Sequence, residues 1–448
     1  MEKETKEKTK TDKSIENIYK LDGRVSIGKA IPYGLQHVLA MFVSNLTPIT
    51  IIAAAARPQL TNAEIGMLIQ DAMFIAGLAT LIQLYPIWRI GSRLPVVMGV
   101  SFTFATILCS IAGNYGYPAV LGAVIIGGIF EGTLGLVIRN ISKLIPPIVC
   151  ATVVCGIGFS LFSVGIRAMG GGYSEDYGSS QNLIIALITL IFFLLWTVLA
   201  KGPFRSLAVL VGLIIGYIVA LCLGKVDLSG IWDNGIITFP HFMLFTPEFH
   251  IGPILSVCII FLVSATETIG DTSALASGGL GREATDREIS GSIAVDGFAS
   301  ATSALFGCPP VTSFSQNVGL IAMTKVVNRF TIMTGAAILL AAGFFPPLGN
   351  LLASLPQSVL GGCTIIMFGQ ILLSGMQMIA KCGFTPRNML IASLSLAIGI
   401  GTTTAGESEI WNIFPKIIQD IFSANVVAVV FVVALLLSII LPKSMDKA

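Results

Sequence analysis

Apolar segments of about 20 residues recur along this chain between Ile31 and Leu441, and each is long enough to cross a bilayer as a helix. So many apolar segments are hard to reconcile with a surface that faces water. Only 11% of the residues are charged, against roughly a quarter in an ordinary soluble domain. The sequence therefore predicts an all-α polytopic membrane protein and excludes an ordinary soluble enzyme.

A hydropathy window of about 19 residues predicts about fourteen transmembrane segments. They leave a charged tail over residues 1–30, one long polar connection over residues 225–251 and short loops, so we expect no separate soluble domain. The tail has no apolar h-region, so we expect a solvated, disordered segment and no cleavable signal peptide. The expected spans are 31–55, 65–87, 95–112, 118–138, 145–166, 183–200, 207–224, 252–276, 290–307, 311–326, 330–352, 357–380, 388–405 and 423–441.

The basic residues predict the orientation of the chain. With the N-terminus in the cytoplasm, all but four of the 26 Lys and Arg residues fall in the tail or in cytoplasmic loops. The four exceptions are Arg57, Arg167, Lys225 and Lys416. One span more or fewer would invert every later loop, so this asymmetry predicts an even number of spans with both termini in the cytoplasm.

Composition also excludes other kinds of site. The net charge of +2 gives no field that would attract nucleic acid. The 8 cysteines include no CxxC pair and no metal-ligand spacing, so we expect no metal site and no cofactor. An intramembrane enzyme would need a nucleophile with a base on a facing helix, and a single histidine, His37, lies in an expected span.

Two of the expected spans, 95–112 and 311–326, look interrupted. Both follow proline and carry a short β-prone sequence, at residues 100–104 and 311–314. They are third in each set of seven spans, and a repeat with an odd number of spans places its two copies in opposite orientations. We therefore expect a 7+7 inverted repeat with short β-strands in segments 3 and 10, and a substrate site beside them. The alternative is two ordinary helices with proline in the first turn.

Ionisable side chains within spans are costly and indicate function by default. Glu267 and Asp271 are four residues apart and share one face of a helix, where two ionised carboxylates would repel each other. A carboxyl there can carry a proton or accept a hydrogen bond from a substrate N–H, although each could also serve packing alone.

Other intramembrane groups are weaker candidates. Asp296, near the start of the ninth span, could couple protons or hold helices together. His37 could orient Glu267, relay a proton, or be a satisfied core histidine. Glu131 and Asp71 have no partner visible in the sequence, and we expect structural or gating roles for both.

The polar segment from Ser315 to Gly319 follows the second interruption. The Gln316 amide offers both donors and an acceptor, which suits the N–H and C=O edge of a planar ring. We expect Ser315 and Gln316 to bind substrate, and Asn317 either to support them or to cap a helix that starts after Gly319.

Residues 316–325, QNVGLIAMTK, match a long motif: Gln, Glu or Pro, then Asn, any residue, Gly, four of any residue, Thr, and Arg, Lys or Gly. This motif resembles the signature of the nucleobase-ascorbate transporter family, also called nucleobase:cation symporter-2. Gln36 with His37, residues 101–104, and Glu267 with Asp271 resemble further family motifs in the same order. The resemblance extends from Ile31 to Pro442.

The resemblance implies a core domain (31–138 and 252–352), a gate domain (145–224 and 357–441) and a homodimer through the gate domains. It implies that Glu267 accepts hydrogen bonds from a nucleobase, that Gln316 binds the other polar edge and that Phe102 lines the ring. The residues that match supporting or coupling positions are Asp271, Asp296, His37 and Asn317.

The substrate also follows from the resemblance. Gln at the first signature position is typical of xanthine and uric acid transporters, Glu of uracil transporters and Pro of ascorbate transporters. We therefore expect proton-coupled import of xanthine and/or uric acid across the cell membrane by alternating access. A uracil permease is one alternative. An anion transporter or channel of the related 7+7 fold is another, but neither interrupted span holds Lys or Arg before Lys325.

Overall fold

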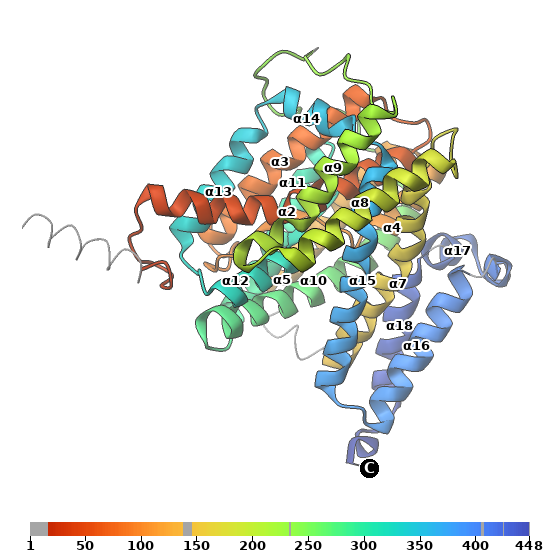
Figure 1. The fold of residues 1–448 in the computed structure, drawn as a ribbon. Helices are drawn as coiled ribbons and strands as arrows, with labels where there is room; N and C mark the ends of the chain where they lie inside the picture. The colour runs from red at the N-terminus through yellow and green to blue at the C-terminus, as the bar shows by residue number, and fades with distance from the viewer. Residues whose placement is uncertain (1–16, 138–145, 233, 405–406, 424, 448) are drawn as a thin grey trace, which may run out of the picture.

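The computed structural model describes residues 17–447 except 138–145, 233, 405–406 and 424, and these residues fold almost entirely into helices (Figure 1). In this part of the chain, seven helices are long and apolar enough to cross a membrane. They are α2 (Ile27–Ala55), α3 (Asn62–Leu84), α5 (Tyr117–Val137), α7 (Pro147–Met169), α8 (Ser180–Leu199), α10 (Ile251–Leu280) and α15 (Gln357–Cys382).

The remaining helices are shorter or less apolar. The apolar ones include α9 (Ala208–Cys222) and α18 (Val426–Ile440). The others are α4 (Ala105–Tyr115), α11 (Asp286–Leu305), α12 (Ser315–Thr324), α13 (Arg329–Ala342), α14 (Pro346–Ala353), α16 (Pro386–Thr404), α17 (Lys416–Phe422) and the 3₁₀ turns η1 (Gly202–Leu207), η2 (Glu407–Ile413) and η3 (Lys443–Lys447).

Two three-residue strands lie at the centre of the fold. Strand β1 (Met98–Val100) pairs antiparallel with β2 (Val311–Ser313), and all of their residues are buried. The pairing continues beyond the strands, where the Phe314 amide donates to the Val97 carbonyl at 3.0 Å. Each strand leads into a short helix, α4 or α12. Pairing lets two non-helical segments satisfy their backbone polar groups away from water.

The segment expected as one span over residues 330–352 is bent in the structure, a break that the sequence analysis did not expect there. Helices α13 and α14 meet at an angle of 82°. Pro346 and Pro347 open α14, and proline cannot donate the hydrogen bonds that would continue α13. At the end of α13, Gly343 lies against Phe74, where an added Cβ would come within 2.5 Å of the Phe74 Cβ.

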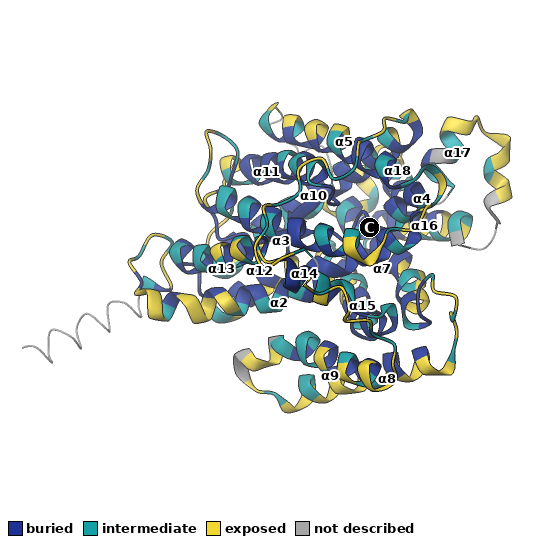
Figure 2. Cartoon of the chain, turned by 90° about the horizontal axis from the view of Figure 1, so that it is seen from above, coloured by how far each residue is buried: buried dark blue, intermediate teal, exposed yellow. Residues whose placement is uncertain are grey.

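The helices pack in two groups. Helices α2–α5 and α10–α14 surround the strands, whereas α7, α8, α9, α15, α16 and α18 pack mainly on one another. Glycines allow the closest approaches within each group: a Cβ on Gly297 would lie 2.0 Å from the Gly132 nitrogen, and one on Gly361 would lie 2.2 Å from the Met169 nitrogen. Helices α8 and α9 are largely exposed along one edge (Figure 2), where apolar side chains can face lipid.

The end of the N-terminal tail is packed rather than free. The Asn328 amide donates to the carbonyls of Asn17, Lys20 and Gly23 at 2.8–3.1 Å, and Asp22 pairs with Arg329. The expectation of a disordered tail is therefore wrong for residues 17–30, about half of which nevertheless stay exposed as expected, and residues 1–16 lie outside the described residues. We call the side on which α2 begins the N-terminal face, and the side on which it ends the opposite face.

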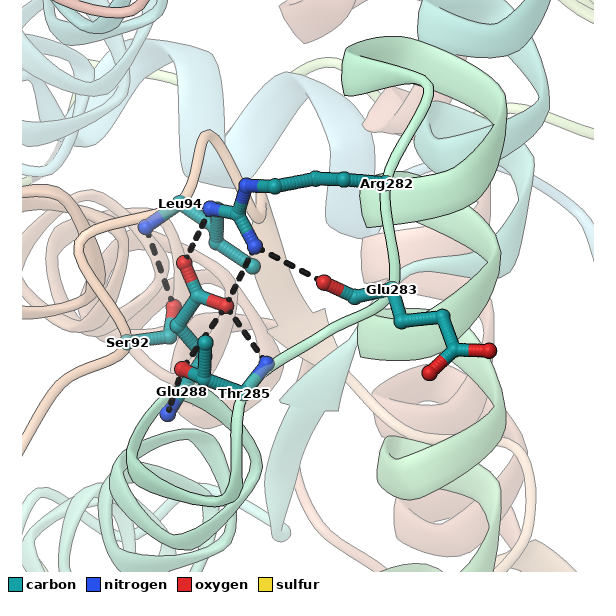
Figure 3. Close-up of polar contacts among 6 residues, drawn as sticks. All are labelled: Ser92, Leu94, Arg282, Glu283, Thr285 and Glu288. Carbon is teal, nitrogen blue, oxygen red and sulfur yellow. Dashed lines mark hydrogen bonds and ion pairs between the residues drawn. The ribbon is translucent and has the colours of Figure 1, made fainter.

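A tight corner joins α10 to α11 on the N-terminal face (Figure 3). Thr285 and Glu288 form a reciprocal capping box at the start of α11. Arg282 donates two hydrogen bonds, of 2.9 and 2.6 Å, to the Glu288 carboxylate. These contacts fix the relative positions of the two helices that carry Glu267, Asp271 and Asp296.

On the opposite face, the long connection between α9 and α10 is anchored to α3. The Asp71 carboxylate accepts the His241 backbone N–H at 2.9 Å and lies 3.3 Å from the His241 ring. Next to it, the Gln70 amide donates to the Thr238 hydroxyl at 2.9 Å. Asp71 thus has a structural partner that the sequence did not reveal.

Candidate substrate site

Glu267 lies within α10 beside the end of β1. The Thr103 hydroxyl donates a hydrogen bond of 2.7 Å to Oε2 of Glu267, and the carboxylate is half-buried. Because Oε1 has no such partner on the strand side, Glu267 keeps acceptor capacity for a ligand.

Asp271 is bound to the other strand. Its two carboxylate oxygens accept hydrogen bonds of 2.7 Å from the hydroxyls of Ser313 and Ser315. The side chain is buried. Asp271 therefore holds the second interrupted segment against α10, and Ser315, expected to bind substrate, donates its hydroxyl to Asp271 in the structure.

Gln316 reaches a large cavity that opens on the N-terminal face. Its Oε1 accepts a hydrogen bond of 3.0 Å from the Ser44 hydroxyl, and the side chain is exposed to the cavity. The cavity has a volume of about 750 Å³, and Gln36 and Gln370 also line it. A planar ligand that entered from this side would meet the free amide nitrogen of Gln316.

Phe102 and Phe368 pack edge to face between the two groups of helices. Their ring centroids are 5.1 Å apart at an interplanar angle of 82°, and both rings are buried. Met367, next to Phe368, accepts a contact of 3.8 Å from the Ser44 hydroxyl. Phe102, expected to line the nucleobase ring, thus contacts α15 in this structure.

His37 and Asn317 pair with each other. The Asn317 amide nitrogen lies 3.1 Å from Nδ1 of His37 and donates to the His37 carbonyl at 3.0 Å. The hydrogen bonds of His37 thus go to Asn317 and not to Glu267. Asn317 lies inside α12, which begins at Ser315, so the expected helix start after Gly319 is wrong.

Asp296 lies one layer behind the site. It accepts a hydrogen bond from the Thr268 hydroxyl on α10 and is fully buried. The sequence placed it near the start of a span, but α11 begins ten residues earlier, at Asp286, so Asp296 lies in mid-helix. Among the described residues, neither carboxylate oxygen of the buried Glu131 has a hydrogen-bond partner, and neither does Oδ1 of Asp296.

Sequence reasoning missed two polar residues that shape the site, Ser44 and Asn45, and it named Thr103 only as part of a motif, without its bond to Glu267. The Asn45 side-chain oxygen accepts the Val100 backbone N–H at 2.7 Å and so fixes β1 against α2. A Ser–Asn pair in the middle of an apolar span was the available signal, because buried polar side chains in a membrane need partners.

The comparisons with known proteins give the family. Residues 28–408 match the Permease family (Xan_ur_permease). The chain belongs to this family. It is 33% identical over 436 residues to a putative purine permease of Clostridium perfringens, covering 95% of this chain and 93% of the relative. It is 33% identical to the uric acid transporter UacT of Escherichia coli (91% and 85% covered) and 32% identical to the xanthine permease of Bacillus subtilis (90% and 92% covered).

These relatives confirm the resemblance to the xanthine and uric acid permease branch, and they identify a transporter rather than an enzyme. Solved structures show the fold. The transmembrane domain of the cyanobacterial bicarbonate transporter BicA has a TM-score of 0.56 at 14% identity, covering 78% of this chain and 93% of that one. Murine Slc26a9, an anion transporter in an inward-facing state, has a TM-score of 0.58 at 11% identity, covering 90% and 68%.

Proposed function

We propose that this protein is a proton-coupled symporter that imports xanthine and/or uric acid across the cell membrane by alternating access. The observation that carries the proposal is the arrangement of Glu267 and Gln316. Both come from the second part of the core: Glu267, an anionic acceptor, bonds to Thr103 beyond β1, and Gln316, an amide, follows β2 and lines a cavity of about 750 Å³. Family relatives named as uric acid and xanthine transporters support the same substrate class.

The chemistry of the two side chains matches an oxidised purine. Such a ring presents N–H donors on one edge and an N–H with a C=O on another. Glu267 can accept from the donors, and Gln316 can both donate and accept. Ser44 holds Gln316 by its oxygen, which leaves the amide nitrogen to meet a ring carbonyl.

The two groups of helices support the proposal of alternating access. We assign residues 31–138 and 252–352 to a core domain and 145–224 and 357–441 to a gate domain, with fourteen segments in a 7+7 inverted repeat. The Phe102–Phe368 pair joins the two domains beside the site. The cavity at Gln316 opens on the N-terminal face, which we assign to the cytoplasm from the distribution of Lys and Arg.

Proton coupling is assigned to the buried carboxyls near the site. Asp271 holds β2 through two hydroxyls, and Asp296 binds Thr268 on the helix that carries Glu267. Protonation of either group would change these hydrogen bonds and so shift the substrate acceptor. His37 and Asn317 support the segment that carries Gln316. We further propose a homodimer through the gate domains.

The decisive experiment is uptake of labelled xanthine into cells that express the chain, with and without a protonophore. Unlabelled urate, uracil, hypoxanthine and ascorbate serve as competitors, and cells that express Glu267→Gln at equal abundance serve as the control. We expect uptake that the protonophore abolishes and that urate, but not uracil, inhibits. Uptake of uracil or of an inorganic anion in place of xanthine would overturn the proposed substrate and leave the family assignment intact.

A further inference from the structure

A second cavity lies toward the opposite face, where α2 ends. It has a volume of about 250 Å³ and lies between α4 and α7, and Thr106, Ser110 and Arg167 line it. Thr106 is three residues along the chain from Thr103, which binds Glu267, and its hydroxyl contacts Ser160 of α7 at 3.3 Å. The cavity is therefore lined by the segment that follows Thr103, and it lies on the side away from the large cavity.

Arg167 gives this second cavity a positive charge. Its guanidinium lies 4.9 Å from the centroid of the Tyr173 ring and 5.9 Å from that of Tyr177. Arg57 also approaches the Tyr173 ring, at 5.8 Å. In the part of the chain that the structure describes, Arg167 forms no ion pair with a carboxylate. It is one of the four basic residues that the charge distribution places away from the cytoplasm.

Tyr173 and Gln357 separate this cavity from a further pocket of about 360 Å³, because both residues line both spaces. The Gln357 amide donates to the Thr50 carbonyl at 3.2 Å and so ties the start of α15 to α2. In the further pocket Lys225 contacts Asp176 at 2.7 Å, and a second carboxylate, that of Asp227, also lines the wall. Among the described residues, Arg167, which has no carboxylate partner, lines the inner space and not the further pocket.

We propose that the second cavity is a vestibule that binds the monoanion of an oxidised purine through Arg167 before the ligand reaches Glu267. This inference rests on the proposed function. A guanidinium is planar and matches the edge of a planar anion, and the hydroxyls of Thr106 and Ser110 add donors. The site itself presents the carboxylate of Glu267, which repels an anion, so a cation on the approach raises the local concentration of the substrate.

The test compares an anionic with a neutral substrate. Initial rates of uptake of labelled urate and labelled xanthine are measured over a range of concentrations at mildly acidic pH, where urate is a monoanion and xanthine is neutral. The variants are Arg167→Gln, Arg167→Lys and Arg57→Gln, each at known abundance in the membrane. Arg57 contacts the same tyrosine but does not line the cavity, so it is the matched control.

We expect Arg167→Gln to raise KM for urate roughly tenfold, the effect of one lost charge-assisted hydrogen bond, and KM for xanthine less than about twofold. Arg167→Lys should restore most of the affinity for urate, and Arg57→Gln should change it less than Arg167→Gln does. If Arg167→Gln raised KM equally for urate and xanthine, or left KM for urate unchanged, the proposed vestibule would be wrong. If the unaltered protein takes up neither purine, the proposed function itself is wrong, and the vestibule falls with it.

Discussion

The Thr103 hydroxyl donates a hydrogen bond of 2.7 Å to Oε2 of Glu267, which ties the segment between β1 and α4 to the middle of α10. The two residues are 164 positions apart in the chain. This bond orients the carboxylate and leaves its other oxygen for a ligand, so Glu267 is preorganised as an acceptor.

Replacing Glu267 by Gln should abolish most uptake of xanthine while leaving the protein folded. The substrate N–H then loses its charged acceptor, and we expect kcat/KM to fall by roughly 10- to 100-fold. Uptake kinetics, with membrane abundance measured in parallel, check this result. Glu283→Gln, on the exposed corner after α10, is the matched control, and unimpaired uptake by Glu267→Gln would remove this residue from the site.

Replacing Gln316 by Glu should weaken purine binding and admit uracil. A carboxylate cannot donate to a ring carbonyl, so KM for xanthine should rise roughly tenfold and unlabelled uracil should begin to compete. Gln370→Glu adds the same charge to the wall of the same cavity and controls for electrostatics alone. If both variants changed KM for xanthine and the competition by uracil equally, Gln316 would not bind the edge of the purine ring.

Replacing Asn45 by Ala should destabilise the strand that positions Thr103. The buried Val100 N–H would lose its acceptor, at a cost of about 1–3 kcal/mol. Thermal unfolding in detergent checks this prediction, with Asn114→Ala at the exposed end of α4 as control. A melting temperature that falls no further than that of the control would show that the Asn45–Val100 bond contributes nothing.

Replacing Gly297 by Ala should force α11 away from α5. The added Cβ would lie 2.0 Å from the backbone nitrogen of Gly132, a contact that only a backbone shift can relieve, at a cost of about 1–3 kcal/mol or more. Gly401→Ala, on α16, meets no atom within 4 Å and should unfold at a temperature no lower than that of the unaltered protein, because Ala favours a helix more than Gly does. Thermal unfolding of the two variants tests this prediction. If Gly297→Ala and Gly401→Ala unfolded at the same temperature, the close packing at Gly297 would be contradicted.

The His241–Asp71 contact should make stability depend on pH. The hydrogen bond to Asp71 raises the pKa of His241 above its usual range. A raised pKa in the folded state stabilises fully below the unfolded pKa, and the stabilisation is lost as pH rises through the folded value. In the unaltered protein we therefore expect the melting temperature to fall by about 1–2 °C as pH rises from below the unfolded pKa of His241 to above its folded pKa. In His241→Gln this fall should be absent. His250→Gln, on the same connection, should retain the decline.

The sequence by itself determined the membrane class, the interrupted segments and the family. Pro95, Pro310 and the β-prone residues that follow them are local signals of interruption. The second strand lies within the expected 311–314, whereas the first covers residues 98–100 and not the expected 100–104. The spacing of Glu267 and Asp271 placed both carboxylates on one helix face. The signature from Gln316 to Lys325 is contiguous in the chain, so no tertiary structure was needed to recognise it.

Only the tertiary structure decided the partners of these groups. Periodicity tells which face of a helix is buried, but it does not tell which side chain from a distant segment meets it. Two contacts of this kind are Thr103 with Glu267 and Asn45 with Val100. The structure also decided that Asp296 lies in the middle of α11. The bend of 82° between α13 and α14 likewise depends on how the segment around Gly343 and the prolines after it packs against α3. The hydropathy of the segment contains no information about this packing.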